Sequence, residues 1–144
     1  MKHKWRHILQ YSLVILLIFS TWITIDHVYA AGKQKTAQDV VDDMGVGWNL
    51  GNSLDAYSYD LGYVTPERTE KLWDNPLTTK QLINTVADAG FGSIRIPVTY
   101  VNHIDDNGNI DKAWLKRIAQ IVNYALDNDL YVIINVHHDT GHEG

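Results

Sequence analysis

The chain has 144 residues, of which 45% are hydrophobic and 20% charged, and a formal net charge of −5 at pH 7. This length suits one globular domain but falls short of the roughly 250 residues of a complete eight-fold β/α barrel. The acidic balance argues against a nucleic acid partner, because phosphate binding needs clustered Lys and Arg. The absence of cysteine excludes thiol catalysis and disulfide bonds.

Residues 1–30 have the pattern of a secretory signal peptide. Basic side chains precede an apolar stretch that is densest at 13–19, and Val28-Tyr29-Ala30 places short residues where signal peptidase cleaves. We predict cleavage after Ala30, and hence a secreted, extracellular protein without stable membrane association. The alternative is an uncleaved membrane anchor over residues 8–25, which the polar residues in that run disfavour.

Helix and strand patterns alternate through residues 31–144, which we interpret as one structural unit. In chain order they predict a helix at Thr36–Met44, a strand at Val46–Leu50, a long aromatic-rich loop at 52–75, a helix opened by a Thr78–Gln81 capping box and ended by Gly90, a strand at Ser93–Val98, a helix capped by Asp111, and a strand at Leu130–Val136. The inward faces of the second and third helices are predicted to be Leu82, Ile83, Val86, Ala89 and Leu115, Ile118, Val122, Ala125, Leu126, with Trp114 structural.

The alternation of strands and helices predicts an α/β fold with a parallel sheet and right-handed crossovers. The third strand is almost wholly apolar, as expected of a parallel strand covered on both faces. Working groups of β/α barrels lie at the carboxyl ends of the strands, so polar residues there are the candidates for chemistry.

Arg95 is the most conspicuous candidate, because it stands between Ile94 and Ile96 and directly before Pro97. A buried guanidinium needs a carboxylate or a bound ligand. A structural ion pair with a neighbouring acid remains an equal alternative at this point.

His137 and His138 end the third strand. Successive strand residues face opposite sides, and the parity of Ile133 and Asn135 indicates that His137 faces the interior while His138 reaches over the rim. With Asp139 and His142 they offer four potential metal ligands. No His-Glu-x-x-His pattern is present, and adjacent strand residues suit one tetrahedral ion poorly, so we predict no metal centre and no cofactor.

Amides, carboxylates and aromatic rings also gather near the first strand. They are turn and core residues in most proteins, but a carbohydrate site needs the same groups for sugar hydroxyls and for the apolar side of the ring. The polar candidates are Asn49, Asn52 and Asp55, and the candidate sugar-facing rings are Trp48, Trp73, Tyr100 and His103.

Three segments together resemble the cellulase-type glycoside hydrolases of family 5: Gly47–Asp55 (GWNLGNSLD), Arg95–Tyr100 (RIPVTY) and Ile133–Asp139 (IINVHHD). The resemblance implies the amino-terminal part, about three strands, of a (β/α)8 TIM barrel. It implies an endo-β-1,4-glucanase type of enzyme that degrades plant cell-wall β-glucan, or a related polysaccharide, with retention of configuration.

The resemblance also implies roles for individual residues. Arg95 and His137 would support catalysis, and Asn52, Asp55 and His138 would contact sugar. Tyr100 stands where many relatives carry tryptophan.

The two reacting glutamates of that family have no counterpart among Glu67, Glu70 and Glu143, the three glutamates present. We therefore expect a truncated barrel that is inactive alone, marginally stable and prone to associate through its third strand. Two other functions stay open: a non-catalytic glycan-binding or structural remnant, and a metal-dependent hydrolase using His137, His138 and His142.

Overall fold

The computed structural model describes residues 34–139. The predicted signal peptide, His142 and Glu143 lie outside this range. The described elements are α2 (Ala37–Met44), β1 (Gly47–Asn49), α3 (Pro66–Thr69), α4 (Lys80–Asp88), β2 (Ser93–Val98), α5 (Lys112–Leu126) and β3 (Tyr131–Val136). From Asp39 onward the described residues belong to one compact unit. This unit contains every element except the first two residues of α2. No helix in the described part of the chain has the length and apolarity needed to cross a membrane.

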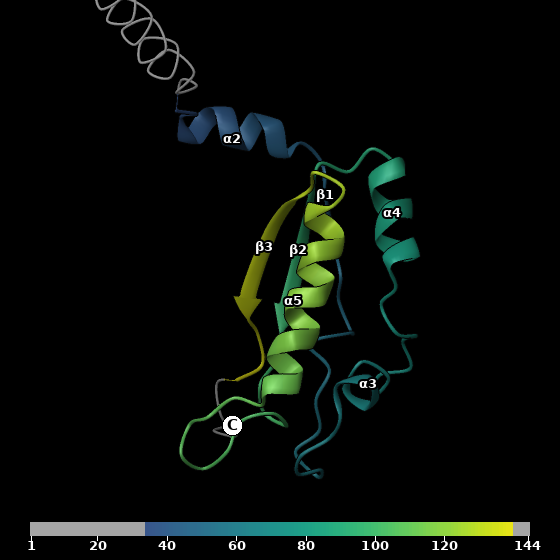
Figure 1. The fold of residues 1–144 in the computed structure, drawn as a ribbon, viewed down its shortest axis with the longest axis vertical. Coiled ribbons are helices and arrows are strands. Elements are labelled where there is room, and N and C mark those ends of the chain that lie inside the picture. The colour runs from purple at the N-terminus through teal and green to yellow at the C-terminus, as the bar shows by residue number, and fades with distance from the viewer. Residues whose placement is uncertain (1–33, 140–144) are drawn as a thin grey trace, which may run out of the picture. The chain divides into compact units, whose positions relative to one another are not determined.

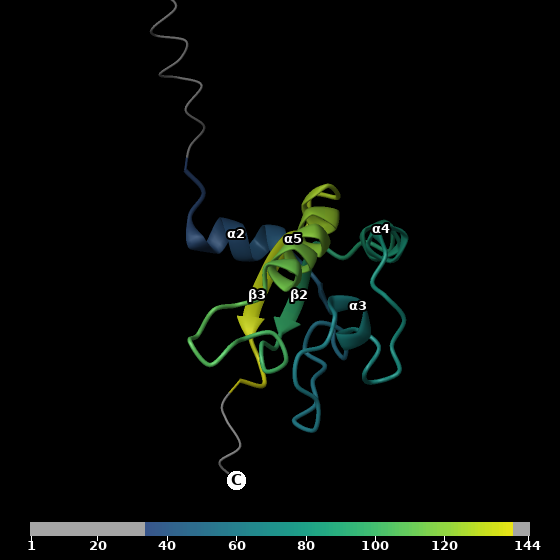
Figure 2. The same cartoon turned by 60° about the horizontal axis from the view of Figure 1, so that its bottom comes forward.

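The three strands form one parallel sheet in the order β1-β2-β3, as the sequence predicts. Asn49 pairs with Arg95, and Arg95 pairs in turn with Ile133. The strands point the same way, so their carboxyl ends meet at one edge of the sheet, which lies toward the bottom of Figure 1. In Figure 2 the connecting loops gather around the arrowheads of β2 and β3.

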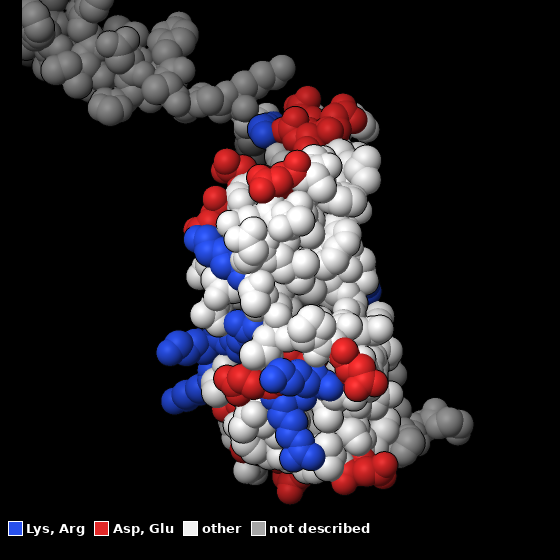
Figure 3. All heavy atoms as spheres, turned by 90° about the vertical axis from the view of Figure 1, so that its right-hand side faces the viewer, with Lys and Arg blue, Asp and Glu red and all other residues white. Residues whose placement is uncertain are grey.

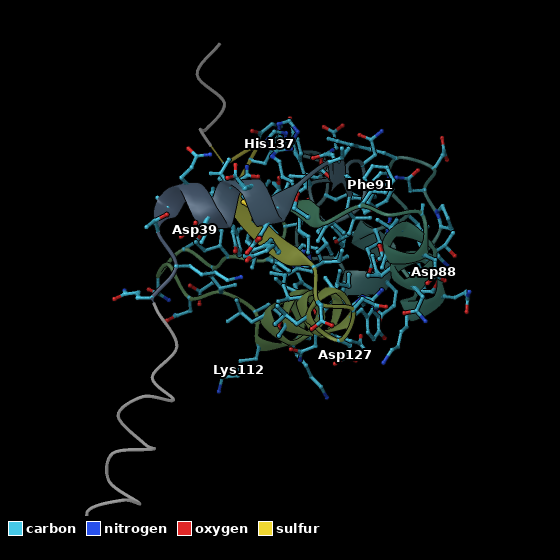
Figure 4. The ribbon with its side chains drawn as sticks, turned by 90° about the horizontal axis from the view of Figure 1, so that it is seen from above. Asp39, Asp88, Phe91, Lys112, Asp127 and His137 are labelled. Atoms are coloured by element: carbon cyan, nitrogen blue, oxygen red, sulfur yellow. The ribbon has the colours of Figure 1, made fainter. Side chains whose placement is uncertain are left out.

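The hydrophobic core lies between the sheet and α5. Ile94, Ile96 and Val98 of β2 are fully buried on one face, where the side chains of α5 join the same cluster. Because side chains alternate along a strand, Arg95 belongs to the opposite face. Figure 4 shows the same division, with His137 across the strands from α5, whose ends are marked by Lys112 and Asp127.

The helices differ from the sequence prediction in one cap and in their buried faces. The cap of α4 is Thr79, whose hydroxyl accepts the Leu82 N–H, while Thr78 is buried and donates its own N–H to Glu70. The predicted capping box was therefore wrong by one position.

Of the residues predicted to face inward on α4, Ile83 and Val86 are buried, whereas Leu82 and Ala89 are exposed. On α5 the buried residues are Trp114, Ile118, Ile121 and Ala125, whereas the predicted Leu115 and Leu126 are exposed.

The third strand is not covered on both faces within the described residues. Ile133, Ile134 and Val136 are 44%, 48% and 66% exposed, because β3 is an edge of the sheet. The prediction was taken from the apolar sequence alone, which does not say whether a neighbouring strand is present.

The long loop between β1 and α4 is ordered by buried polar contacts. It contains α3 and the fully buried Glu70, which accepts hydrogen bonds from the Arg117 guanidinium at 2.6 and 3.0 Å and from the Thr78 N–H at 2.8 Å. The Asn102 side-chain amide donates to three carbonyl groups of the same loop, including that of Ser58. These contacts fix the loop over the carboxyl edge of the sheet, where residues following β1 must be placed.

Basic and acidic side chains are interspersed on the face of the molecule shown in Figure 3. A face of mixed sign gives no extended basic surface of the kind that binds phosphate backbones.

Candidate active site

Arg95 stands at the centre of the face opposite α5. Its two terminal nitrogens contact the Asn49 side-chain oxygen at 2.6 Å and His137 Nδ1 at 3.4 Å. Within residues 34–139 no carboxylate forms an ion pair with it. Of the two alternatives for Arg95, the structural ion pair is therefore not the one seen in the described part of the chain. The guanidinium is held by an amide and an imidazole and keeps donors for an anion.

Arg95 and His137 come together because of the strand register. Asn49 and Arg95 are direct neighbours across β1 and β2, and Ile133 continues the same row on β3. The alternation from Ile133 through Asn135 to His137 keeps the imidazole on that face, as the sequence predicts. His137 Nδ1 also lies 3.5 Å from the Asn135 side-chain nitrogen.

His138 lies next to His137 rather than on the opposite face. The His137 N–H still donates to the Val98 carbonyl, but the alternation of side chains does not continue past His137, so the two imidazole rings are 4.2 Å apart. The His138 N–H donates to the Thr99 hydroxyl at 3.2 Å, which fixes this turn of the chain to the end of β2. Asp55 completes the group: one ligand atom each from Asp55, His137 and His138 lies within 4.8 Å of the others.

An aromatic cluster borders the two histidines. Tyr57 contacts the rings of Tyr59, Trp73 and His138 at centroid distances of 4.9, 5.5 and 5.2 Å, and Trp73 contacts His138 at 5.6 Å. The Trp73 indole N–H donates to the Tyr57 carbonyl. Trp73, predicted as a sugar-facing ring, is thus placed beside His138, and the cluster supplies apolar surface next to polar groups.

Asn52 and Asp55 are placed by the turn that follows β1. Asn52 is exposed and has a positive φ of 60°, a conformation that asparagine tolerates better than most residues. Asn75 fixes this turn by donating its side-chain N–H to the carbonyls of Gly51 and Asn52. Asp55 is 4% exposed and accepts the Ser53 N–H at 2.9 Å, so its carboxylate is oriented before any ligand arrives.

Tyr100 lies at the rim, where its backbone N–H donates to Asp139 Oδ1 at 2.7 Å. Burial, and to a lesser extent the charge of Asp139, raise the pKa of the Tyr100 phenol above its usual value. The phenol therefore stays protonated at neutral pH and can donate a hydrogen bond.

Two residues predicted to face sugar are placed elsewhere. Trp48 pairs with Ile94, so it is on the face covered by α5, and its side chain packs against the core. His103 is 3% exposed, stacked on Trp114 at 4.0 Å, and its Nε2 lies 2.8 Å from the Thr69 hydroxyl. Neither ring offers a face at the carboxyl edge of the sheet, because aromatic character in the sequence does not distinguish core from site.

Sequence reasoning missed Tyr57, Asn75 and Thr99, which help to build this edge. It named Asp139 only as a potential metal ligand, and Asn49 only as a polar candidate beside Asn52 and Asp55. Only the strand pairing identifies Asn49 as the partner of Arg95. Tyr57 and Asn75 belong to a loop whose course no short-range pattern predicts.

The carboxyl edge carries groups that suit a polar, ring-shaped ligand, and no glutamate among residues 34–139 reaches it. It offers amide, imidazole, guanidinium and carboxylate groups beside aromatic rings, which is what a sugar requires. The two glutamates within the described residues do not meet there, since Glu70 is buried against Arg117 and Glu67 lies in α3.

The known proteins to which this chain is similar are glycoside hydrolases. Residues 54–144 match the family model described as cellulase (glycosyl hydrolase family 5). The chain is similar to Endoglucanase A of Clostridium longisporum, with 46% identity over 110 residues, and to Endoglucanase B of Paenibacillus lautus, with 42% identity over 131 residues. These matches cover 76% and 90% of this chain but only 21% and 22% of the two enzymes.

Solved structures give the same result. A broad-specificity endoglucanase from an uncultured bacterium superposes with a TM-score of 0.73 at 43% identity, covering 82% of this chain and 32% of that one. A family 5 enzyme from Prevotella bryantii, solved in complex with a xyloglucan tetradecasaccharide, superposes with a TM-score of 0.70 at 43% identity, covering 76% of this chain and 31% of the other. The chain thus spans about a third of each solved relative, and its three parallel strands are the amino-terminal part of a (β/α)8 barrel, as predicted.

Proposed function

Because the chain belongs to the cellulase family of glycosyl hydrolases, family 5, we propose that it provides the sugar-binding and supporting half of a secreted endo-β-1,4-glucanase. The observation that carries the proposal is the contact of Arg95 with Asn49 and His137 at the carboxyl edge of the sheet, beside His138 and its aromatic neighbours. The substrate class is β-glucan of the plant cell wall, including xyloglucan.

We assign each group the role that the family resemblance implies, and the geometry of the site supports it. Arg95 would stabilise a carboxylate nucleophile that is not among residues 34–139, because its guanidinium lacks an anion there. His137 would keep the guanidinium in place. Asn52, Asp55 and His138 would bind sugar hydroxyls, while Trp73 and Tyr57 pack beside His138 and present apolar surface.

Retention of configuration would require two carboxyl groups about 5 to 5.5 Å apart. Neither Glu67 nor Glu70 can serve, for the reasons of burial and position given above. We therefore propose that residues 31–144 alone bind glycan without hydrolysing it, and that the reacting pair belongs to the barrel strands that the relatives carry beyond this region.

Binding and turnover are tested separately with soluble xyloglucan and mixed-linkage β-glucan. Calorimetry should show binding that His138→Ala weakens about tenfold or more, while Tyr63→Ala leaves it unchanged, because Tyr63 contacts Asp111 and not His138. A reducing-sugar assay on the same protein should show no release. Release by pure protein would refute the proposed inactivity, and unchanged binding by His138→Ala would refute the site.

Secretion is proposed from residues 1–30 and is tested independently. The protein recovered from the medium of a producing cell should begin at Ala31. Retention of the intact amino terminus in the membrane fraction would favour the anchor instead.

A further inference from the structure

Asp55, His137 and His138 are the one group of three potential metal ligands found among the described residues. The sequence argued against a metal here because adjacent strand residues face opposite ways. That argument does not apply, since the alternation of side chains does not continue past His137 and the two imidazole rings are 4.2 Å apart. We propose that these three side chains form a binding site for a divalent transition metal ion such as Zn²⁺ or Cu²⁺.

The donor set determines the class of ion. Two imidazole nitrogens and one carboxylate oxygen suit Zn²⁺, Ni²⁺ and Cu²⁺, whereas Ca²⁺ and Mg²⁺ prefer oxygen ligands throughout. Three protein ligands leave a coordination position for water. Ligand atoms about 2.0 to 2.2 Å from an ion lie about 3.4 Å apart in a tetrahedral site. The ligand atoms of the three residues lie within 4.8 Å of one another, so they must come closer by about 1 Å when an ion binds.

Contacts with neighbouring residues hold two of the three proposed metal ligands, Asp55 and His138, in place. Asp55 is buried and one of its oxygens accepts the Ser53 N–H. The backbone of His138 is fixed to Thr99, and its ring is bordered by Tyr57 and Trp73. Side chains that are already held in place lose less conformational entropy when the ion binds, which lowers the free-energy cost of binding.

Arg95 opposes the ion and thereby gives the proposal a distinctive test. Its guanidinium lies 3.4 Å from His137 Nδ1, so a divalent cation at the cluster would be repelled by a positive charge within a few ångströms. Neutralising Arg95 should therefore tighten metal binding, which is the opposite of what damage to the fold would do.

The ion would occupy side chains that the proposed function assigns to sugar. Metal binding would then inhibit glycan binding, and this consequence alone rests on the proposed function. The metal site itself depends only on the three ligands.

The test is calorimetric titration of the full, tag-free chain with ZnCl₂, with CaCl₂ as the contrasting ion. We expect one Zn²⁺ per chain and no Ca²⁺ binding. Asp55→Asn and His138→Gln should each weaken Zn²⁺ binding about tenfold or more, and Arg95→Gln should tighten it about tenfold. His142→Gln, which changes a histidine outside the described residues, is the matched control and should have no effect.

Two results would overturn the inference. One is the absence of Zn²⁺ binding by the wild-type chain. The other is binding that His142→Gln abolishes while Asp55→Asn and Arg95→Gln leave it unchanged, which would place the ion elsewhere. Because Asp55 is buried, far-UV circular dichroism of each variant should confirm that it folds. If Asp55→Asn does not fold, the tighter Zn²⁺ binding expected for Arg95→Gln still decides the test. Electron paramagnetic resonance of the Cu²⁺ form should show two nitrogen ligands.

Discussion

At the scale of single residues, strand register and burial decide which side chains reach the carboxyl edge of the sheet. Arg95 contacts His137 on the face opposite α5. Trp48 pairs with Ile94, and His103 stacks on Trp114, so both of these rings belong to the core.

The buried His103 predicts a loss of stability in acid. Burial lowers its pKa from 6.5 to about 4, although the nearby Asp111 carboxylate acts in the opposite direction. The neutral form is therefore favoured by folding, so this contribution is fully present above pH 6.5 and is lost as the pH falls toward 4. At pH 5 the loss should be about 1–2 kcal/mol.

Urea unfolding of wild type and His103→Gln between pH 7.5 and 5 measures this effect. The free energy of unfolding should fall more steeply for wild type, because the variant has lost the titrating group. Parallel curves would show that protonation of His103 does not oppose folding.

Among single residues, polar groups were easier to predict than aromatic ones. Arg95 was predictable because a charge in an apolar strand requires a partner, and His137 because the parity of β3 places it on the same face. Trp48 and His103 were wrongly assigned to the sugar site, because an aromatic ring suits either a core or a sugar site. Only the register with Ile94 and the stacking on Trp114 decide between the two.

At the scale of elements, strand positions were easier to predict than helix faces. The bounds of β2 were predicted residue for residue, because Gly92 and Pro97 delimit a short apolar run. On α5 the inward face was predicted one residue away from Trp114 and Ile121. A helix with apolar residues on more than one side does not reveal which side meets the sheet.

The backbone packing around Gly92, just before β2, leaves no room for a side chain. A Cβ atom there would lie 2.6 Å from the Met44 carbonyl oxygen, which is backbone and cannot rotate away. Gly92→Ala should therefore lower the free energy of unfolding by about 1–3 kcal/mol. Gly62→Ala is the control, since a Cβ atom at Gly62 meets nothing within 4 Å. Equal melting temperatures for the two variants would disprove the steric account.

The Glu70–Arg117 pair predicts strong coupling between the β1–α4 loop and α5. Arg117→Leu leaves a fully buried carboxylate without its guanidinium and should cost about 3–5 kcal/mol, while adding Glu70→Gln should recover part of that loss. By contrast, the Lys80–Asp127 pair is about half exposed, and Lys80→Leu should cost less than about 1 kcal/mol. If the double variant has the same free energy of unfolding as Arg117→Leu alone, the buried ion pair is not the source of the coupling.

At the scale of the whole molecule, the exposed edge of β3 predicts self-association. Among residues 34–139 no strand pairs with the outer edge of β3, where Ile134 and Val136 are exposed, and such edges pair with other chains. Sedimentation velocity should show a weight-average mass that rises with concentration. Ile134→Lys should suppress the rise, whereas Leu115→Lys on the exposed side of α5 should not. A monomer at all concentrations would contradict this prediction.

The fold class was predictable from the sequence because three strand ends carry polar groups at matching places along a regular strand-helix alternation. The loop of residues 50–79 was not, since its course depends on Glu70, Asn75 and Asn102 contacting partners distant in the chain. The ring contacts of Tyr57 with Trp73 and His138 follow from that course and were invisible for the same reason.

The central claim is that the carboxyl edge of the sheet binds β-glucan. The most direct measurement is a nuclear magnetic resonance titration of the isotope-labelled chain with a cello-oligosaccharide, following the backbone amides and histidine side chains. We predict chemical-shift changes concentrated at Asn52, Asp55, Trp73 and His138, and none at the core residue His103. Shifts confined to other surfaces, or none at saturating sugar, would contradict it.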